Sequence, residues 1–349
     1  MTKSFSLGAA LALLLATSTL AEPLVYIPVG NAGKIEVVDA ATGSIIREYT
    51  GLEAVHGLAG TPDGQLLIAG SYAEREPGSA SVPKPEGMSD EDHAIHHMAS
   101  TTSPEDRPEM VSTVSILRAD NGELVRTVDV PGAVHHVTTS PDGRFAAVTQ
   151  PAYDAVSVID LQTYEVTTIQ TGSLPNYMVF SADSQNLYVS NAGEDTIAVI
   201  GTTHWMVQSK IATGTAPEHM VISADGNMLY VNNNDDGSVS AIALATGAMV
   251  DTYQIGELLH GLDITSDGAA LLVAERDGDN VARVDLASGE VSKQAMGPSP
   301  YHMTTITGTN LAYVSSSDEA VMKIINQDDM SLLGRIEIGD VGHQMVVGQ

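Results

Sequence analysis

Short apolar stretches alternate with turns rich in Gly, Asp, Asn and Ser along most of the chain. One unit shows the pattern clearly, with alternating segments at Val221–Ile222, Met228–Val231, Val239–Ala243 and Met249–Ile255. Alternation with a period of two, bounded by such turns, is typical of β-strands rather than helices. The pattern therefore predicts an all-β chain in which each unit holds four short strands.

A turn of the form Ser/Thr-x-Asp-Gly recurs at a nearly constant spacing. Its copies are Thr61–Gly64, Ser140–Gly143, Ser181–Ser184, Ser223–Gly226 and Thr265–Gly268, with a weaker copy at Thr307–Asn310. Repeats aligned on this turn begin near positions 55, 134, 175, 217, 259, 300 and 341. Four strands in each repeat of about 40 residues predict a β-propeller.

The two ends of the chain each hold part of one repeat. The last repeat leaves only Val341–Gln349, which is enough for one strand, and residues 22–54 hold the three strands that it lacks. Pairing the two ends would close the ring and protect the sheet edges that an open array exposes. We predict one seven-bladed β-propeller domain over residues 22–349, interrupted by an insertion at residues 74–110.

Two of the predicted strands carry a more specific signal. Tyr188–Asn191 (YVSN) and Tyr230–Asn233 (YVNN) resemble the YVTN motif of YncE-like propellers, and Val156–Asp160 resembles the strand that usually follows it. The resemblance covers nearly all of residues 22–349. Its superfamily also holds the propellers of cytochrome d1 and nitrous oxide reductase, so the resemblance implies the fold and leaves the function open.

Residues 1–21 have the pattern of a secretory signal. Lys3 precedes the apolar run Leu7–Ala16, and Thr19–Ala21 is a small-x-small cleavage pattern. The apolar run is too short to span a bilayer. We therefore expect an exported chain that is periplasmic and monomeric, with no membrane insertion.

Composition narrows the chemistry. The chain has 15 Lys plus Arg, 44 Asp plus Glu and a formal net charge of −29, so nucleic acid is not an expected partner. It has no Cys, which excludes disulfides, thiolate nucleophiles and Cys-ligated zinc. The acidic loops match no calcium-binding motif, and no nucleophile elbow, Walker or Rossmann motif is present.

Seven of the 11 histidines occupy one place in the repeat. Three lie seven residues before the turn Asp, namely His56, His135 and His260. Three lie one position later in the same repeat frame, namely His136, His219 and His302. The seventh, His343, begins the last strand. The innermost strand of every blade lines the central channel, so the repeat predicts a ring of imidazoles at one channel mouth. Such a ring would suit a transition metal, whereas the structural alternative is hydrogen bonding to a neighbouring blade's backbone.

The insertion carries three more histidines. His93 and His97 are spaced i, i+4, and His93 and His96 are spaced i, i+3, so a short helix would place each pair on one face. The insertion falls between the second and third strands of its blade, which predicts that it emerges on the same face as the histidine ring. The alternative is a solvated acidic loop whose histidines have no role.

These features predict a metal-binding protein, with zinc or copper as the ion. Met98, Met220 and Met303 each follow a histidine, and their thioethers would favour copper. The alternation of the strands, however, places Met220 and Met303 at positions that point into the core. Asp90 and Asp92 would favour zinc, which we expect in preference to copper. A flexible histidine loop and a histidine ring suit a metal chaperone that serves a transporter's binding protein or a metalloenzyme, a layout that resembles the propeller-type zinc chaperones.

Two other classes of function remain open. One is a metal- or haem-dependent oxidoreductase component similar to the nitrous oxide reductase or cytochrome d1 propeller. The other is an interaction scaffold that binds no metal.

Overall fold

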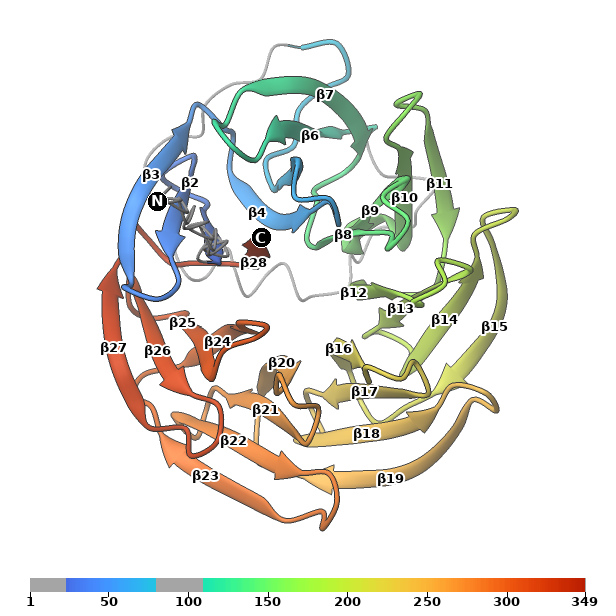
Figure 1. Cartoon of the computed structure of the whole chain (residues 1–349). Coiled ribbons are helices and arrows are strands. Elements are labelled where there is room, and N and C mark those ends of the chain that lie inside the picture. Colours follow the sequence, from blue (N-terminus) through green and yellow to red (C-terminus); the bar gives the residue numbers. More distant parts are fainter. Residues whose placement is uncertain (1–22, 80–108, 349) are drawn as a thin grey trace, which may run out of the picture.

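The computed structural model describes residues 23–79 and 109–348, which form a ring of seven four-stranded antiparallel sheets (Figure 1). Blade 1 contains β28 (Val346–Gly348), β1 (Leu24–Val29), β2 (Lys34–Asp39) and β3 (Ser44–Thr50). Blade 2 contains β4 (Val55–Gly60), β5 (Leu66–Ser71), β6 (Val111–Arg118) and β7 (Leu124–Pro131). Blade 3 contains β8 (Val137–Thr139), β9 (Phe145–Gln150), β10 (Ala155–Asp160) and β11 (Val166–Gln170).

The remaining four blades follow in chain order. Blade 4 contains β12 (Pro175–Phe180), β13 (Asn186–Asn191), β14 (Thr196–Gly201) and β15 (Met206–Ala212). Blade 5 contains β16 (Pro217–Ile222), β17 (Met228–Asn233), β18 (Ser238–Ala243) and β19 (Ala248–Gln254). Blade 6 contains β20 (Leu259–Ile264), β21 (Ala270–Glu275), β22 (Asn280–Asp285) and β23 (Val291–Ala295), and blade 7 contains β24 (Pro300–Thr305), β25 (Leu311–Ser316), β26 (Val321–Asn326) and β27 (Leu332–Glu337).

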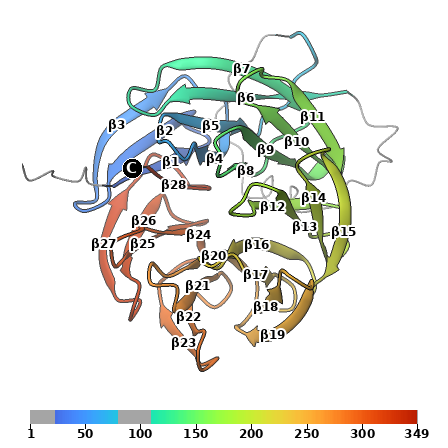
Figure 2. The same ribbon diagram turned by 45° about the vertical axis from the view of Figure 1, so that its right-hand side comes forward.

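The predicted fold class is confirmed. In each blade the first strand lies nearest the axis of the ring and the last strand lies at the rim, as the turned view also shows (Figures 1 and 2). Among the described residues, the one helical element is a 3-10 turn at Pro151–Tyr153. No helix in that part of the chain is long and apolar enough to cross a membrane.

Blade 1 is assembled from both ends of the chain, as the repeat arithmetic predicts. β28 pairs antiparallel with β1 in the register Leu24↔Gly348, Val25↔Val347 and Tyr26↔Val346. An isolated bridge between Val29 and Gly342 adds a further contact between the two ends of the chain. The closing strand is therefore shorter than the segment 341–349 that the sequence predicts.

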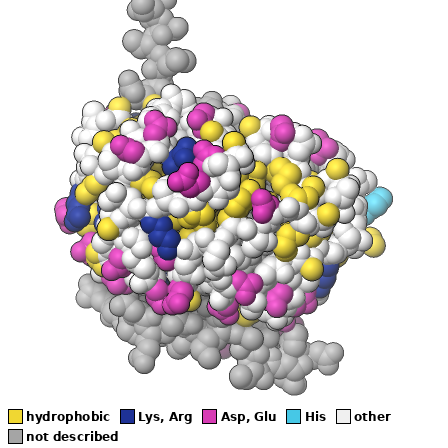
Figure 3. Space-filling model, turned by 90° about the horizontal axis from the view of Figure 1, so that it is seen from below, with side chains coloured by type: hydrophobic (Ala, Val, Ile, Leu, Met, Phe, Trp, Pro, Cys, Tyr) yellow, Lys and Arg dark blue, Asp and Glu magenta, His cyan; other side chains and the backbone are white. Residues whose placement is uncertain are grey.

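The recurring turn motif has one hydrogen-bonding pattern. In each full copy the Ser or Thr hydroxyl donates to the Asp carboxylate at 2.6 Å, as in Thr61–Asp63 and Ser223–Asp225. The backbone amide two residues after the Asp then donates to the same carboxylate oxygen. Some of the chain's many Asp residues therefore stabilise turns. Figure 3 shows acidic side chains scattered over one face of the molecule among fewer basic ones.

The apolar core is divided among the blade interfaces. Seven buried clusters are present, and each one combines side chains of two adjacent blades. The cluster between blades 7 and 1, for example, packs Val25 and Ile27 against Tyr313 and Met322. Burial of apolar surface thus holds each blade to its neighbours around the whole ring.

The insertion leaves the ring where the sequence places it. β5 ends at Ser71 and β6 begins at Val111, so the inserted segment joins the second and third strands of blade 2. At its base, Arg75 forms a bridge with Val111 and an ion pair with Asp129 at 2.5 Å. Residues 80–108, which include His93, His96 and His97, lie outside the described residues.

Gln344 joins the C-terminal segment to two other blades. Its amide oxygen accepts hydrogen bonds from the backbone N–H groups of Leu58 at 3.3 Å and Val137 at 3.0 Å. Its amide nitrogen donates to the Val137 carbonyl at 2.9 Å. One side chain therefore satisfies three buried backbone groups in blades 2 and 3.

Substitution of Gln344 by Ala should lower the free energy of unfolding by about 2–4 kcal/mol, because buried backbone groups lose their partners. Urea unfolding would measure the change. The control is Gln294→Ala on the exposed strand β23, which should change stability by less than about 0.5 kcal/mol. Equal effects of the two substitutions would show that Gln344 does not support ring closure.

Candidate metal centre

The seven repeat-positioned histidines come together in the central channel. His56, His219, His260 and His302 lie on the innermost strands β4, β16, β20 and β24, whereas His135, His136 and His343 lie just before β8 and β28. Their rings follow one another around the axis, with centroid distances of 4.9 Å (His56–His135), 4.1 Å (His135–His136), 5.0 Å (His136–His219), 4.6 Å (His219–His260), 4.7 Å (His260–His302), 6.2 Å (His302–His343) and 4.2 Å (His343–His56). The predicted ring is present, and six of its members are 1–4% exposed.

Breaks in the strand ladder accompany four of the seven channel histidines. The pairing register of β4 shifts between Val55 and Gly57, and the same shift flanks His219 on β16, His260 on β20 and His302 on β24. A bulge re-aims side chains because one strand carries an extra residue. The two histidine positions of the sequence frame therefore fall within one bulge.

Glycine allows the innermost strands to approach each other at this level. A Cβ at Gly57 would lie 2.8 Å from the carbonyl oxygen of His135, and a Cβ at Gly261 would lie 2.8 Å from the amide nitrogen of Met303. Both distances are shorter than side chains tolerate. The residue after His56 and after His260 is thus glycine because the next blade's backbone occupies that space.

Backbone carbonyls fix the tautomer of two histidines. His136 Nδ1 lies 2.8 Å from the carbonyl oxygen of Asn176, and His56 Nδ1 lies 2.9 Å from that of His135. A carbonyl oxygen only accepts, so Nδ1 carries the proton in both rings. In a neutral imidazole this leaves Nε2 as the nitrogen with the lone pair, which is the atom that binds metals.

Within residues 23–79 and 109–348, three histidines from three blades form a close group of possible metal ligands. One nitrogen from each of His136, His219 and His302 lies within 4.8 Å of the other two, and all three side chains are buried. Three nitrogens bound to one zinc ion lie about 3.3 Å apart, given Zn–N bonds of about 2.0–2.1 Å. The three rings therefore need only a small closing movement to share one ion.

His260 contacts this group and also a carboxylate. Its ring lies 4.6 Å from that of His219 and 4.7 Å from that of His302. Its Nδ1 lies 2.9 Å from Glu218 Oε2, and Glu218 Oε1 accepts a hydrogen bond from Asn234 at 3.0 Å. Burial raises the pKa of Glu218 to about 7.

Burial keeps two of the channel histidines neutral at physiological pH. It lowers the pKa of His302 well below its usual value, and the neighbouring histidines act in the same direction. It also lowers the pKa of His343 to about 4, against the opposing effect of Asp340. A neutral imidazole keeps its lone pair, so these two side chains remain able to bind metal at neutral pH.

Tyrosines line the same part of the channel and were not assigned a role from the sequence. Tyr301 stacks on His260 with ring centroids 4.0 Å apart, and Tyr177 stacks on His219 at 4.3 Å. The guanidinium of Arg276 lies over the outer part of this group, 5.3 Å from the Tyr301 ring centre. Tyr177 and Tyr301 occupy the histidine position of their repeats or the one beside it, so the repeat alignment could have identified them as channel residues. No pattern in the sequence marked Arg276.

The methionines that follow two of the histidines do not join the site. Met220 and Met303 are buried within the apolar clusters between adjacent blades. This confirms the interpretation that these two positions point into the core. Met98 lies outside the described residues, as do Asp90 and Asp92.

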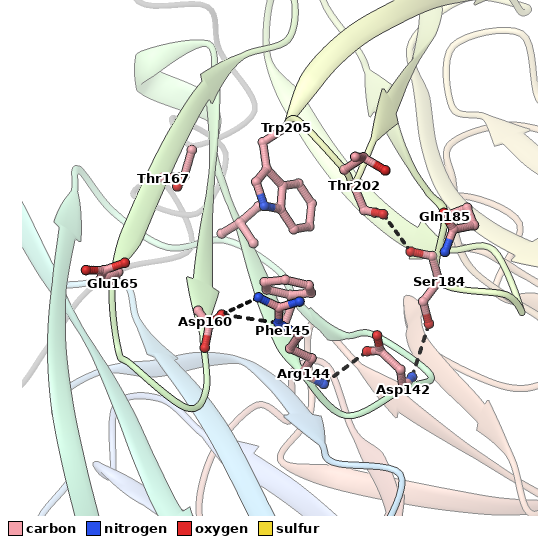
Figure 4. Close-up of a pocket in the computed structure, with 12 residues that line it drawn as sticks. Asp142, Arg144, Phe145, Asp160, Glu165, Thr167, Ser184, Gln185, Thr202 and Trp205 are labelled. Atoms are coloured by element: carbon pink, nitrogen blue, oxygen red, sulfur yellow. Dashed lines mark hydrogen bonds and ion pairs between the residues drawn. The ribbon is translucent and has the colours of Figure 1, made fainter.

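A second concave site lies at the rim, between blades 3 and 4 (Figure 4). It is a cleft of about 430 Å³ in which the Trp205 and Phe145 rings meet edge to face at 4.8 Å. Arg144 lies over Phe145 and donates two hydrogen bonds to Asp160 at 3.3 Å. The lining residues include no histidine, so this cleft offers no imidazole ligand.

The sequence matches a known family over most of this fold. A family model for the lactonases with a seven-bladed β-propeller matches residues 44–305, about three quarters of the chain. The chain belongs to this lactonase family. The resemblance to YncE-like propellers thus gave the correct fold, while the family that matches is a different one. No curated protein sequence matches the chain.

Solved structures of low sequence identity share the fold of this lactonase-family chain. The Pseudomonas aeruginosa periplasmic gluconolactonase matches with a TM-score of 0.71 and 16% identity, covering 94% of this chain and 99% of that one. A provisionally assigned 6-phosphogluconolactonase from Bacteroides fragilis matches with a TM-score of 0.71 and 15% identity, covering 95% and 99%. Kuenenia stuttgartiensis hydrazine synthase matches with a TM-score of 0.66 and 20% identity, covering 86% and 90%.

His343 should make the fold sensitive to acid. Its pKa is about 4 in the folded chain and about 6.5 when unfolded, so the unfolded state takes up a proton that the folded state excludes between these values. Stability is therefore lost as the pH falls through this window. Relative to His343→Gln, the wild type should lose up to about 3 kcal/mol between pH 7 and pH 4.

Urea unfolding at several pH values, in the presence of a chelator, would measure this difference. The comparison with the variant cancels the opposite contribution of buried carboxylates such as Glu218. Parallel stability curves for the two proteins would contradict a neutral, buried His343.

Proposed function

We propose that the protein binds a transition-metal ion in the central channel of the propeller, with His136, His219 and His302 as ligands. The observation that carries the proposal is the approach of three buried imidazole nitrogens, from three different blades, to within 4.8 Å of one another. Structural hydrogen bonds alone would not require the three side chains to converge on one point. Burial also keeps His302 unprotonated, as ligation requires.

Zinc and copper are the ions that we propose. Neutral imidazole is a good ligand for both, and the chain has no thiolate to select between them. Met220 and Met303 cannot supply thioether ligands that would favour copper, because both are packed in the core. Zinc is therefore the first ion to test.

The proposed role in metal trafficking rests on the sequence rather than on the comparisons. The histidines of the insertion would capture an ion and pass it to the channel or to a transporter's binding protein or a metalloenzyme. The base of the insertion lies on blade 2, which also carries His56. We place the protein in the periplasm because residues 1–21 have an export pattern, and the periplasmic gluconolactonase shares its fold.

A metal-assisted hydrolase is the second candidate. It is favoured by the membership in the lactonase family and by the fold shared with a gluconolactonase. A bound metal ion could polarise the carbonyl of a cyclic ester or lower the pKa of a water molecule. Under this proposal the channel histidines hold the catalytic ion instead of a cargo ion.

The metal proposal predicts tight binding that depends on the channel histidines. A background with His93, His96 and His97 replaced by Gln would restrict zinc uptake to the ring. In that background zinc should bind with a dissociation constant below about 1 μM, and His302→Gln should weaken binding by at least about 100-fold. His204→Gln, at an exposed turn, is the control and should bind like its parent.

Competition with a chromophoric chelator would give these affinities, and elemental analysis would give the stoichiometry. Binding no tighter than micromolar in the parent, or equal binding by the His302 variant, would rule out the channel site. The folded state of each variant would be checked by its thermal unfolding in chelator.

The hydrolase proposal predicts that the zinc-loaded protein opens gluconolactone faster than the chelated protein. The His302→Gln variant should lose this acceleration, because it lacks a ligand of the proposed ion. A pH-stat assay corrected for spontaneous opening would measure the rates. The same rate with and without zinc would remove this candidate and leave the binding proposal intact.

A further inference from the structure

Glu218 is a buried carboxylate that the three-histidine site does not use. It lies on β16 of blade 5, next to His219, and contacts His260 on β20 of blade 6. We infer that Glu218 is a positioning residue, which orients His260 as the fourth imidazole ligand of the channel ion. The inference rests on the proposed metal site and adds a residue that acts through His260.

The ring of His260 is held from several directions. Its Nδ1 lies 2.9 Å from Glu218 Oε2, and the Tyr301 ring is stacked on its face with an interplanar angle of 11°. The side-chain amide of Asn232 donates to the His260 backbone carbonyl. A ring fixed at its edge, face and backbone keeps one orientation, and this lowers the entropy lost when it binds an ion.

The hydrogen bond to the carboxylate also selects the tautomer. When Glu218 is ionised, its carboxylate accepts the proton of Nδ1, so the neutral ring presents its lone pair on Nε2. His260 lies beside both His219 and His302, with ring centres 4.6 and 4.7 Å away. The ligand nitrogens of His136, His219 and His302 lie within 4.8 Å of one another, and His260 is outside this group, so its Nε2 would complete a four-coordinate shell only after its ring moves toward the ion.

Glu218 is a better positioning residue than ligand. Its Oε2 is engaged with His260, and its Oε1 accepts a hydrogen bond from Asn234 at 3.0 Å. In its ionised form, which a nearby cation favours, it would also supply negative charge to a divalent ion that otherwise meets only neutral imidazoles. A carboxylate behind a ligating histidine raises the basicity of that ligand, and removing such partners typically costs about 10–100-fold in metal affinity.

The test is the substitution Glu218→Gln, which keeps the shape of the side chain but no longer imposes the tautomer of His260. We expect zinc affinity to fall about 10–100-fold. The visible spectrum of the Co²⁺-loaded protein should also change, because the ligand field reports the number of nitrogen ligands. Both measurements would use the background that lacks the insertion histidines.

Glu275→Gln is the matched control. Glu275 is a buried carboxylate of blade 6 that is bonded to Lys293 at 2.8 Å and to Asn280 at 3.0 Å instead of a histidine. It should keep the parent's zinc affinity and Co²⁺ spectrum. A Glu218→Gln protein that folds, with the parent's affinity and spectrum, would overturn the inference.

A second variant covers the case in which Glu218→Gln does not fold. Asn234→Ala removes the hydrogen bond to Glu218 Oε1 while the carboxylate stays in place, and it should weaken zinc binding by up to about 10-fold. No change in this variant's affinity or spectrum would then overturn the inference. If the parent itself binds no zinc, the proposed metal site fails, and this outcome is distinct from a failure confined to Glu218.

Discussion

Closure of the ring is the constraint on which the rest of the structure depends. β28 pairs with β1, so the first and last segments of the chain complete one blade, and seven apolar clusters join each blade to the next. Once the ring is closed, the innermost strands have a fixed distance from the axis. A side chain at one position of the repeat is then brought near its equivalents from the other blades, although these lie about 40 residues apart in the sequence.

The histidines of the channel combine two roles that the sequence presents as alternatives. The Nδ1 atoms of His56 and His136 bond to the backbone of a neighbouring residue or blade, as a purely structural histidine would. In a neutral ring the same bonds leave Nε2 as the lone-pair nitrogen. The structural hydrogen bond therefore prepares the histidine for ligation and does not compete with it.

Much of the fold could be predicted from local sequence patterns, because a propeller repeats one four-stranded unit. The Ser/Thr-x-Asp-Gly turns marked the strands, and the leftover Val341–Gln349 predicted the closing strand. The approach of the seven histidines to one another could be predicted from the spacing of the repeats. The positioning contacts did not, because Glu218, Arg276 and Gln344 act across blade interfaces and repeat in no other blade. The three histidines that converge, His136, His219 and His302, are those one position later in the repeat frame, but the frame alone did not show that this position converges.

The central claim is that the channel holds a metal ion between His136, His219 and His302. The most direct measurement is anomalous X-ray diffraction at the zinc absorption edge from crystals of the zinc-loaded protein. The account predicts one strong anomalous peak on the channel axis, within bonding distance of a nitrogen of each of these three histidines. A fully loaded crystal whose anomalous peaks all lie outside the channel would contradict it.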